Sequence, residues 1–146
     1  MNVTIIGVDL AKNIFHLCGI NAEGKVLFKK KMQRNKLLEF VANQPICTIA
    51  MEACSSSQYW ARRFKQHQHE IKLIAPHLVK PYVKSNKNDF NDAQAIAEAA
   101  SRKHMRFVPL KTIEQQDIQS LHRIRKELVD SRTRLVIALN NKFQTI

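Results

Sequence analysis

The order of strand-like and helix-like segments most constrains how this chain can fold. Short apolar, β-branched runs are typical of strands, whereas longer segments with apolar residues at helical spacing indicate helices. The predicted strands span residues 3–10, 14–20, 25–31, 46–52 and 71–75, and the predicted helices between the later strands span 35–41 and 58–65. Only short turns separate the first three strands, so we expect them to form an antiparallel meander. The whole order predicts an α/β fold, with flanking helices on a mixed sheet whose first three strands are antiparallel.

A second constraint lies near the end of the chain, which contains no Pro or Gly from Thr112 onward. Leu121, Leu128 and Leu135 recur at intervals of seven residues, and further apolar residues widen the stripe. We predict one long helix of about 30 residues, which is too long and too apolar to stand alone in water. Leucines at this spacing favour a coiled coil, and hence a homo-oligomer (a dimer or a higher assembly). The alternative is that the helix packs back on its own domain.

Composition indicates a globular protein with a polyanionic partner. Lys and Arg total 24 against 12 acids, which gives a formal net charge of +12 and a pI near 10.0. Such an excess favours nucleic acid, although a merely soluble basic surface is the alternative. No apolar run approaches the roughly 18 residues of a membrane span, so we expect no membrane association. Three cysteines without a CxxC pair predict neither a disulfide framework nor a zinc site.

The length of 146 residues fits one domain with an appendage. We predict a domain over residues 1–110, followed over 111–146 by the long helix as a coiled-coil dimerisation segment. The chain stops inside this helix without a cap, so we expect the segment to be truncated and the chain to be part of a longer protein.

Four acidic residues lie where predicted strands end or a helix begins. Asp9 ends the first strand and Glu52 ends the fourth, while Asp89 and Asp92 precede an alanine-rich helical run over 93–100. If the first and fourth strands are parallel neighbours, the first two acids share one edge of the sheet, and a helix laid across that edge adds the other two. Converging carboxylates suit Mg²⁺ or Mn²⁺, and two such ions suit phosphodiester chemistry. The alternative is that one Asp is the N-cap of the helix and the other a first-turn acid.

Lysines close to these acids are candidates for phosphate contacts. Lys80, Lys84 and Lys87 flank the acidic group along the chain, so we assign them to nucleic-acid binding. Two other basic clusters, at residues 29–31 and 62–65, are interpreted as solvated surface.

Three motifs in the chain resemble those of a known family. They are Gly7-Val8-Asp9-Leu10-Ala11-Lys12, Met51-Glu52-Ala53-Cys54 with Tyr59-Trp60-Ala61, and Asn86-Lys87-Asn88-Asp89 with Asp92-Ala93. Together they resemble the DEDD-type insertion-sequence transposases and the related Piv-type pilin-gene DNA invertases. The resemblance implies a ribonuclease-H-like (RuvC-like) fold for residues 1–110. It also implies that Asp9, Glu52, Asp89 and Asp92 form a catalytic tetrad that binds Mg²⁺.

The resemblance implies partners as well. Family members recombine DNA, and insertion-sequence members are guided by a structured RNA that the element encodes. We therefore expect this chain to bind DNA and a structured guide RNA, with Lys12 of the first motif among the contacting lysines. We expect it in the bacterial cytoplasm, associated with the nucleoid. In the family a C-terminal domain that supplies a nucleophilic serine follows, and we expect this chain to end before it.

Several other residues have less specific interpretations. Ser55, Ser56 and Ser57 stand where the family often has glycines and a small residue, so we interpret them as a helix-capping loop rather than as nucleophiles. Tyr59 and Trp60 are interpreted as core side chains rather than as platforms for base stacking.

The predicted function is that of the metal-dependent catalytic domain of a DNA transposase or site-specific recombinase, which binds nucleic acid and takes part in strand cleavage and exchange. The alternative is a basic, dimerising DNA- or RNA-binding fragment without catalytic activity of its own. An ATPase of the actin and sugar-kinase type shares the strand–Asp–turn start. Such a protein needs glycine-rich phosphate loops, which the three glycines of this chain cannot build.

Overall fold

The computed structural model describes residues 2–85 and 88–144 of the chain. Its strands are β1 (Ile5–Asp9), β2 (Ile14–Ile20), β3 (Val26–Gln33), β4 (Thr48–Glu52), β5 (Glu70–Ile74) and β6 (Phe107–Val108). Its helices are α1 (Arg34–Ala42), α2 (Ser57–Lys65), α3 (Pro76–Val79), α4 (Asp89–Ala100) and α5 (Ile113–Gln144), with a 3-10 turn η1 (Lys80–Tyr82) after α3. The chain divides into two compact units, Met1–Leu110 and Lys111–Ile146.

Six strands form one sheet in the order β3-β2-β1-β4-β5-β6. β1, β2 and β3 are an antiparallel meander, while β1 pairs in parallel with β4 and β4 in parallel with β5. The predicted mixed α/β sheet with an antiparallel start is therefore confirmed. The sequence did not reveal β6, because a strand of two residues is too short to show an alternating pattern.

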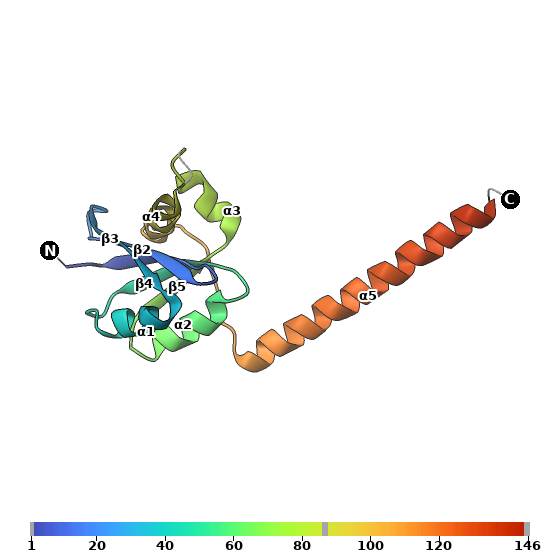
Figure 1. The fold of residues 1–146 in the computed structure, drawn as a ribbon, viewed down its shortest axis with the longest axis horizontal. Helices are drawn as coiled ribbons and strands as arrows, with labels where there is room; N and C mark the ends of the chain where they lie inside the picture. The colour runs from blue at the N-terminus through green and yellow to red at the C-terminus, as the bar shows by residue number, and fades with distance from the viewer. Residues whose placement is uncertain (1, 86–87, 145–146) are drawn as a thin grey trace. The chain divides into compact units, whose positions relative to one another are not determined.

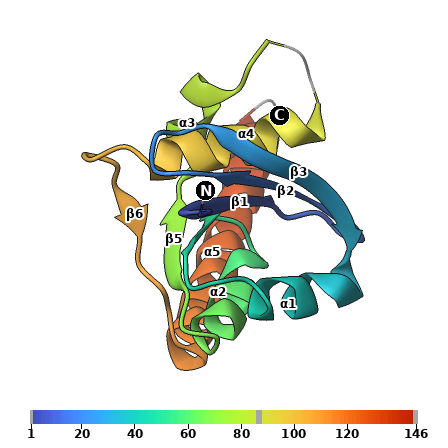
Figure 2. The same ribbon diagram turned by 90° about the vertical axis from the view of Figure 1, so that its left-hand side faces the viewer.

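Helices cover both faces of this sheet (Figures 1 and 2). α1 and α2 lie on one face, and α3 and α4 lie on the other. Since successive side chains of a strand point to opposite faces, β1 contributes to two cores. Ile6 and Val8 pack in the core that contains Trp60 of α2. Ile5 packs in the core that contains Ile96 of α4.

The backbone of α4 packs directly on β1 at Gly7. A Cβ atom at this position would lie 2.2 Å from the carbonyl oxygen of Ala93 and 2.8 Å from the amide nitrogen of Ala97. Ala93 and Ala97 are fully buried, so the helix presents only methyl groups to the strand here. This close approach fixes the first turn of α4 over the end of β1, because Asp92 adjoins Ala93 and Asp9 lies two residues beyond Gly7 on the same face.

Asn88, rather than an aspartate, caps α4. Its side-chain oxygen accepts a hydrogen bond of 3.0 Å from the backbone N–H of Phe90. The interpretation of one Asp as the N-cap is therefore wrong, since Asp89 and Asp92 both lie in the first turn. Both acids are thus left to interact with the helix dipole and with groups outside the helix.

Two other helices begin differently from the sequence-based expectation. α1 begins at Arg34 after Gln33, which makes no side-chain cap, so Asn35 already lies inside the helix. At the start of α2, the hydroxyl of Ser57 donates to the carbonyl oxygen of Cys54 at 2.9 Å and accepts from the N–H of Cys54 at 3.1 Å. These two bonds close the turn between β4 and α2.

The second unit consists mainly of α5, a single helix of 32 residues with no buried side chain. Its apolar stripe is open to solvent, and Leu121, Leu128 and Leu135 are each 66% exposed. No helix in the described ranges 2–85 and 88–144 is both long and apolar enough to span a bilayer.

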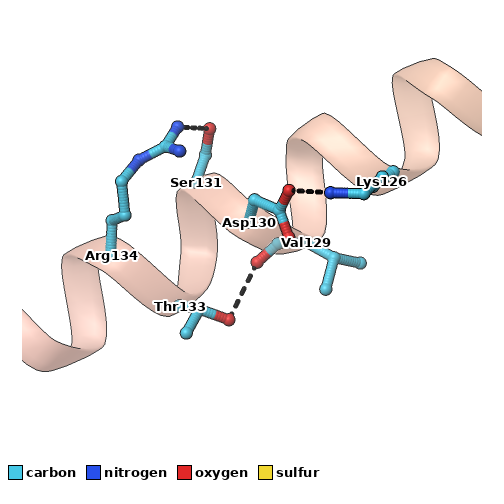
Figure 3. A network of polar contacts seen from close by, with 6 residues as sticks. All are labelled: Lys126, Val129, Asp130, Ser131, Thr133 and Arg134. Atoms are coloured by element: carbon cyan, nitrogen blue, oxygen red, sulfur yellow. Dashed lines mark hydrogen bonds and ion pairs between the residues drawn. The ribbon is translucent and has the colours of Figure 1, made fainter.

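Polar side chains on α5 form contacts along the helix itself (Figure 3). Lys126 Nζ donates to Asp130 Oδ2 at 2.6 Å, and Arg134 Nη2 donates to Ser131 Oγ at 2.9 Å. Thr133 Oγ1 donates to the carbonyl oxygen at position 129. The two side-chain pairs, three and four residues apart, support helix formation without using the apolar stripe.

We expect Gly7→Ala to destabilise the first unit by about 1–3 kcal/mol, because the added methyl group would overlap the backbone of α4 and neither partner can rotate away. Urea unfolding followed by circular dichroism measures the loss.

A useful control is Gly19→Ala on β2. A Cβ there would meet atoms of the Phe28 ring, a side chain that can rotate, so the cost should be smaller. Equal stability of Gly7→Ala and the parent protein would contradict the proposed role of this contact.

Candidate active site

The C-terminal ends of β1 and β4 lie next to each other at one edge of the sheet. The parallel register pairs Val8 with Met51, so Asp9 and Glu52 follow as adjacent strand ends. The first turn of α4 lies on the same face, held by the contact at Gly7. Three separate parts of the chain therefore bring acidic residues to one region.

A pocket of about 400 Å³ opens in this region. Asp9, His16, Lys31 and Asp89 line it, together with residues of the β1–β2 turn. The registers of the sheet explain the grouping, because Asp9 pairs with His16 and His16 pairs with Lys31 across three neighbouring strands. Directly paired residues point to the same face, so one acid, one imidazole and one ammonium group form a row below Asp89.

Burial and neighbouring charges raise the pKa of Asp9 from 3.8 to about 6. Desolvation is the largest cause, and Asp92 is the next. His16 opposes the shift, while Asp89 and Glu52 add to it. Asp9 therefore interacts electrostatically with all three of the other predicted tetrad residues.

Glu52 has a raised pKa for the same two reasons, burial first and then the charge of Asp92. Asp92 is thus the strongest acidic neighbour of Asp9 and also a named neighbour of Glu52. This places Asp92 of α4 over the strand ends, whereas Asp89 lines the pocket and is the more exposed of the pair.

His16 is a site residue that sequence reasoning did not assign. Its Nε2 atom lies 3.6 Å from Asp89 Oδ2, and its ring meets the ring of Phe90 edge-on at 4.9 Å between centroids. The signal lay in the hairpin register: a turn centred between residues 12 and 13 pairs positions 9 and 16. The turn of residues 11–13 expected from the sequence is centred on residue 12, which would pair position 9 with position 15. This change of register by one residue would place His16 on the other face of the sheet.

The predicted nucleic-acid contacts are only partly near the acids. Lys12, Lys80 and Lys84 are exposed, and none of them lines the pocket in the part of the chain that the structure describes. Lys84 lies close enough to β2 for its charge to act on Cys18. Lys87 lies outside the described residues. Lys31, interpreted from sequence as solvated surface, is the lysine that lines the pocket.

The acids affect one another's pKa electrostatically, over distances longer than a bond between a ligand and a metal ion. Within residues 2–85 and 88–144, no three His, Cys, Asp or Glu side chains are arranged to hold a metal ion. Ligand bonds to Mg²⁺ or Ca²⁺ are only about 2.0–2.6 Å long, whereas charges shift each other's pKa over greater distances. The donor set still fits a hard cation, because it supplies carboxylate oxygens and carries negative charge that a cation would compensate.

Comparison with known proteins connects the chain to mobile DNA elements. A family model for IS110-type DEDD proteins, described as "Transposase", matches residues 6–146. The transposase for insertion sequence element IS1111A of Coxiella burnetii is 50% identical over 143 residues, which cover 98% of this chain and 39% of that protein. A probable family 20 transposase of Pseudomonas aeruginosa is 48% identical over 135 residues, covering 92% of this chain and 40% of that protein. The chain spans about two fifths of the length of these relatives.

Solved structures with a similar fold are of RuvC from Thermus thermophilus. One of them superposes with a TM-score of 0.54 and 12% identity, over 71% of this chain and 99% of that one. A second structure, of RuvC in complex with Holliday junction substrate, superposes with a TM-score of 0.51 and 12% sequence identity. The superposition covers 67% of this chain and 92% of that chain. The RuvC-like, ribonuclease-H-like fold predicted for the chain is confirmed.

The raised pKa of Asp9 predicts a pH-dependent cost of folding. The folded protein protonates Asp9 near pH 6 and the unfolded chain near 3.8, so the folded state holds more protons between about pH 4 and 6. The contribution of Asp9 to the free energy of unfolding therefore falls as the pH rises from about 4 to 6. Because Asn carries no charge, Asp9→Asn should gain stability relative to the parent protein from pH 4 to pH 7, as measured by urea unfolding in EDTA. A difference independent of pH would contradict the raised pKa.

Proposed function

The chain belongs to the DEDD-type transposase family of insertion sequences, and on this premise we propose that residues 1–110 act as its metal-dependent DNA-cleaving domain. The observation that supports this most is the meeting of Asp9, Glu52 and the acidic first turn of α4 at one edge of a RuvC-like sheet. The domain would take part in the strand cleavage and exchange by which an insertion sequence moves.

Asp9, Glu52, Asp89 and Asp92 are the proposed ligands of Mg²⁺ or Mn²⁺. When bound, two such ions would activate an attacking oxygen and stabilise the leaving oxygen at a phosphodiester. The carboxylates would compensate the charge of the ions, and bound cations would in turn favour the charged form of Asp9, whose pKa is raised by burial and by the neighbouring acids. Their side chains would have to turn inward to reach ligand distance.

Other side chains of the pocket position the acids and the DNA. We assign His16 the role of orienting Asp89, through the 3.6 Å contact between Nε2 and Oδ2 and the support of Phe90. Lys31 adds a positive charge to the lining of the pocket, where it would pair with a phosphate oxygen. Such a contact holds the DNA backbone in place without reading its sequence.

The remaining lysines would extend this phosphate-binding surface. Lys12, Lys80, Lys84 and Lys87 are the proposed contacts to DNA or to a structured guide RNA, and the net charge of +12 supports a nucleic-acid partner.

Self-association through α5 is proposed for the second unit. The seven-residue repeat of Leu121, Leu128 and Leu135 is complementary to a second copy of itself, and all three side chains are exposed. A homo-oligomer would bury this stripe and would bring two catalytic domains to one DNA substrate.

A second candidate function is nucleic-acid binding without catalysis. It is favoured by the open arrangement of the acids within the described residues, where no metal-ready cluster of three is formed. In that case the acids would be structural and the basic surface would carry the function.

We expect the chain to bind Mn²⁺ in calorimetry, and the double variant Asp9→Asn/Glu52→Gln to bind it more than about 100-fold more weakly. Losing a direct ligand should exceed the roughly 10–100-fold cost of losing a supporting group. A matched control is Glu23→Gln/Glu39→Gln, which removes two exposed carboxylates from elsewhere on the same unit.

If neither protein binds Mn²⁺, the titration is repeated with duplex DNA, whose phosphates complete many such sites. Binding that is still absent, or equal in both proteins, would overturn the catalytic proposal and leave the binding function.

Leu128→Glu should convert the oligomer to a monomer in sedimentation velocity, because a carboxylate in the apolar seam would weaken association by more than about tenfold. Thr133→Glu adds the same charge to α5 away from the leucine stripe, and it should leave the assembly intact. Identical sedimentation of the parent and Leu128→Glu would exclude this seam as the interface.

A further inference from the structure

A second, larger pocket lies in the first unit, next to the carboxylate pocket. It has a volume of about 640 Å³, within the range of sites that bind small molecules. Its walls come from the end of the β1–β2 turn, the start of α1 and one side of α2. We call it the aromatic pocket and define it by Asn13, Arg34, Tyr59, Trp60 and Arg63.

Two aromatic rings and two guanidinium groups make up most of its chemistry. The Arg34 guanidinium lies 5.3 Å from the centroid of the Trp60 ring, and that of Arg63 lies 5.6 Å from the centroid of the Tyr59 ring. In the part of the chain that the structure describes, neither arginine forms an ion pair with a carboxylate. The positive charge of the pocket is therefore available to an anionic ligand.

The two rings differ in exposure. Trp60 is only 5% exposed, and it packs edge-on against Tyr59 with centroids 5.3 Å apart. Tyr59 is 44% exposed. The expectation that both are core residues is thus correct for Trp60 but wrong for Tyr59, which offers a ring surface at the mouth of the pocket.

Trp60 also carries an unmet hydrogen-bonding group. Its indole N–H is buried and finds no acceptor among the described residues. Buried polar groups are nearly always paired, and an exception calls for an explanation. Because the nitrogen itself is covered by protein atoms, a ligand acceptor would reach it only after neighbouring side chains move, so the binding surface of the pocket is that of Tyr59 and the two arginines.

The aromatic pocket and the carboxylate pocket share Asn13 and Ile14 as lining residues. A nucleic-acid strand whose phosphate lies at the acids would therefore pass this opening. Unpaired bases stack on aromatic rings and on arginine, and the sugar-phosphate that follows each base is the anion that the free guanidinium groups favour.

We propose that the aromatic pocket binds one unpaired nucleotide of the strand held at the carboxylates, with its base against the exposed ring of Tyr59 and its phosphate near Arg34 and Arg63. This inference rests on the proposed function as regards the class of ligand. It adds a subsite that selects locally melted strands over intact duplex, since a paired base cannot enter a pocket.

Trp60 is the single tryptophan of the sequence and lines this pocket, so tryptophan fluorescence comes from one position beside the proposed ligand. We would titrate the full chain with a single-stranded oligothymidylate of about ten nucleotides, in EDTA, and with a dT·dA duplex of equal length. We expect saturable quenching by the single strand and little by the duplex. An oligouridylate of equal length tests the source of the strand: tighter quenching by dT assigns the pocket to DNA, and tighter quenching by rU assigns it to the RNA.

Three variants distinguish base stacking on Tyr59 and the local charge of Arg63 from general attraction between the basic protein and the strand. Tyr59→Leu should weaken the single-strand titration by about tenfold, the effect of one lost base stack, and Arg63→Gln should weaken it severalfold. Lys65→Gln removes the same charge from the same helix outside the pocket and should have little effect. Circular dichroism checks that the three variants remain folded.

The proposal is overturned if the single strand does not quench Trp60, if the duplex quenches it equally, or if Arg63→Gln and Lys65→Gln weaken binding alike. Failure of the catalytic proposal would look different. Mn²⁺ binding would then be absent in calorimetry, while the single strand would still quench Trp60 fluorescence. The quenching titration is done in EDTA and so does not depend on the metal ligands.

Discussion

The contact between β1 and α4 at Gly7 is the constraint on which the site depends. The helix backbone reaches the strand with no side chain between them, since a Cβ at this position would lie 2.2 Å from a carbonyl oxygen of the helix. Close packing of this kind leaves little freedom to slide or tilt. The acids of the first helical turn are therefore held over the strand ends. The alanines of α4 have two effects. Their small side chains allow the helix to come this close to the strand, and they favour helix formation.

The second organising feature is negative charge concentrated in a basic protein. The chain has twice as many basic as acidic residues, yet four of its acids gather near two strand ends. The cost is visible in the raised pKa of Asp9 and Glu52. The fold tolerates this cost because other residues of the same strands and helix hold the acids in place. These residues pack in the two cores on either side of the sheet. Strongly perturbed pKa values of this kind cluster at functional sites.

Apolar patterning predicted much of this architecture, because it records which faces are buried. The three-strand start follows from segment order. The adjacency of Asp9 and Glu52 follows from their places at strand ends once β1 and β4 are parallel neighbours, a condition that the sequence left open and the sheet meets. The role of His16 was not predictable at the same level, since it depends on hairpin register to within one residue. The aromatic pocket was missed for another reason. Its walls come from three elements that only the folded chain brings together, and residue type alone cannot separate the exposed Tyr59 from its buried neighbour Trp60.

The site combines acids from widely separated parts of the sequence, and this has a consequence during protein synthesis. A ribosome releases the N-terminal part of a chain first, so Asp9 and Glu52 emerge long before α4. Until α4 emerges and packs on Gly7, one face of the sheet is uncovered and half of the proposed ligands do not yet exist. If the domain cleaves DNA as proposed, translation order would delay that chemistry until the domain is whole. On the same proposal, an unfinished polypeptide that a stalled ribosome releases before α4 would leave the DNA around it intact.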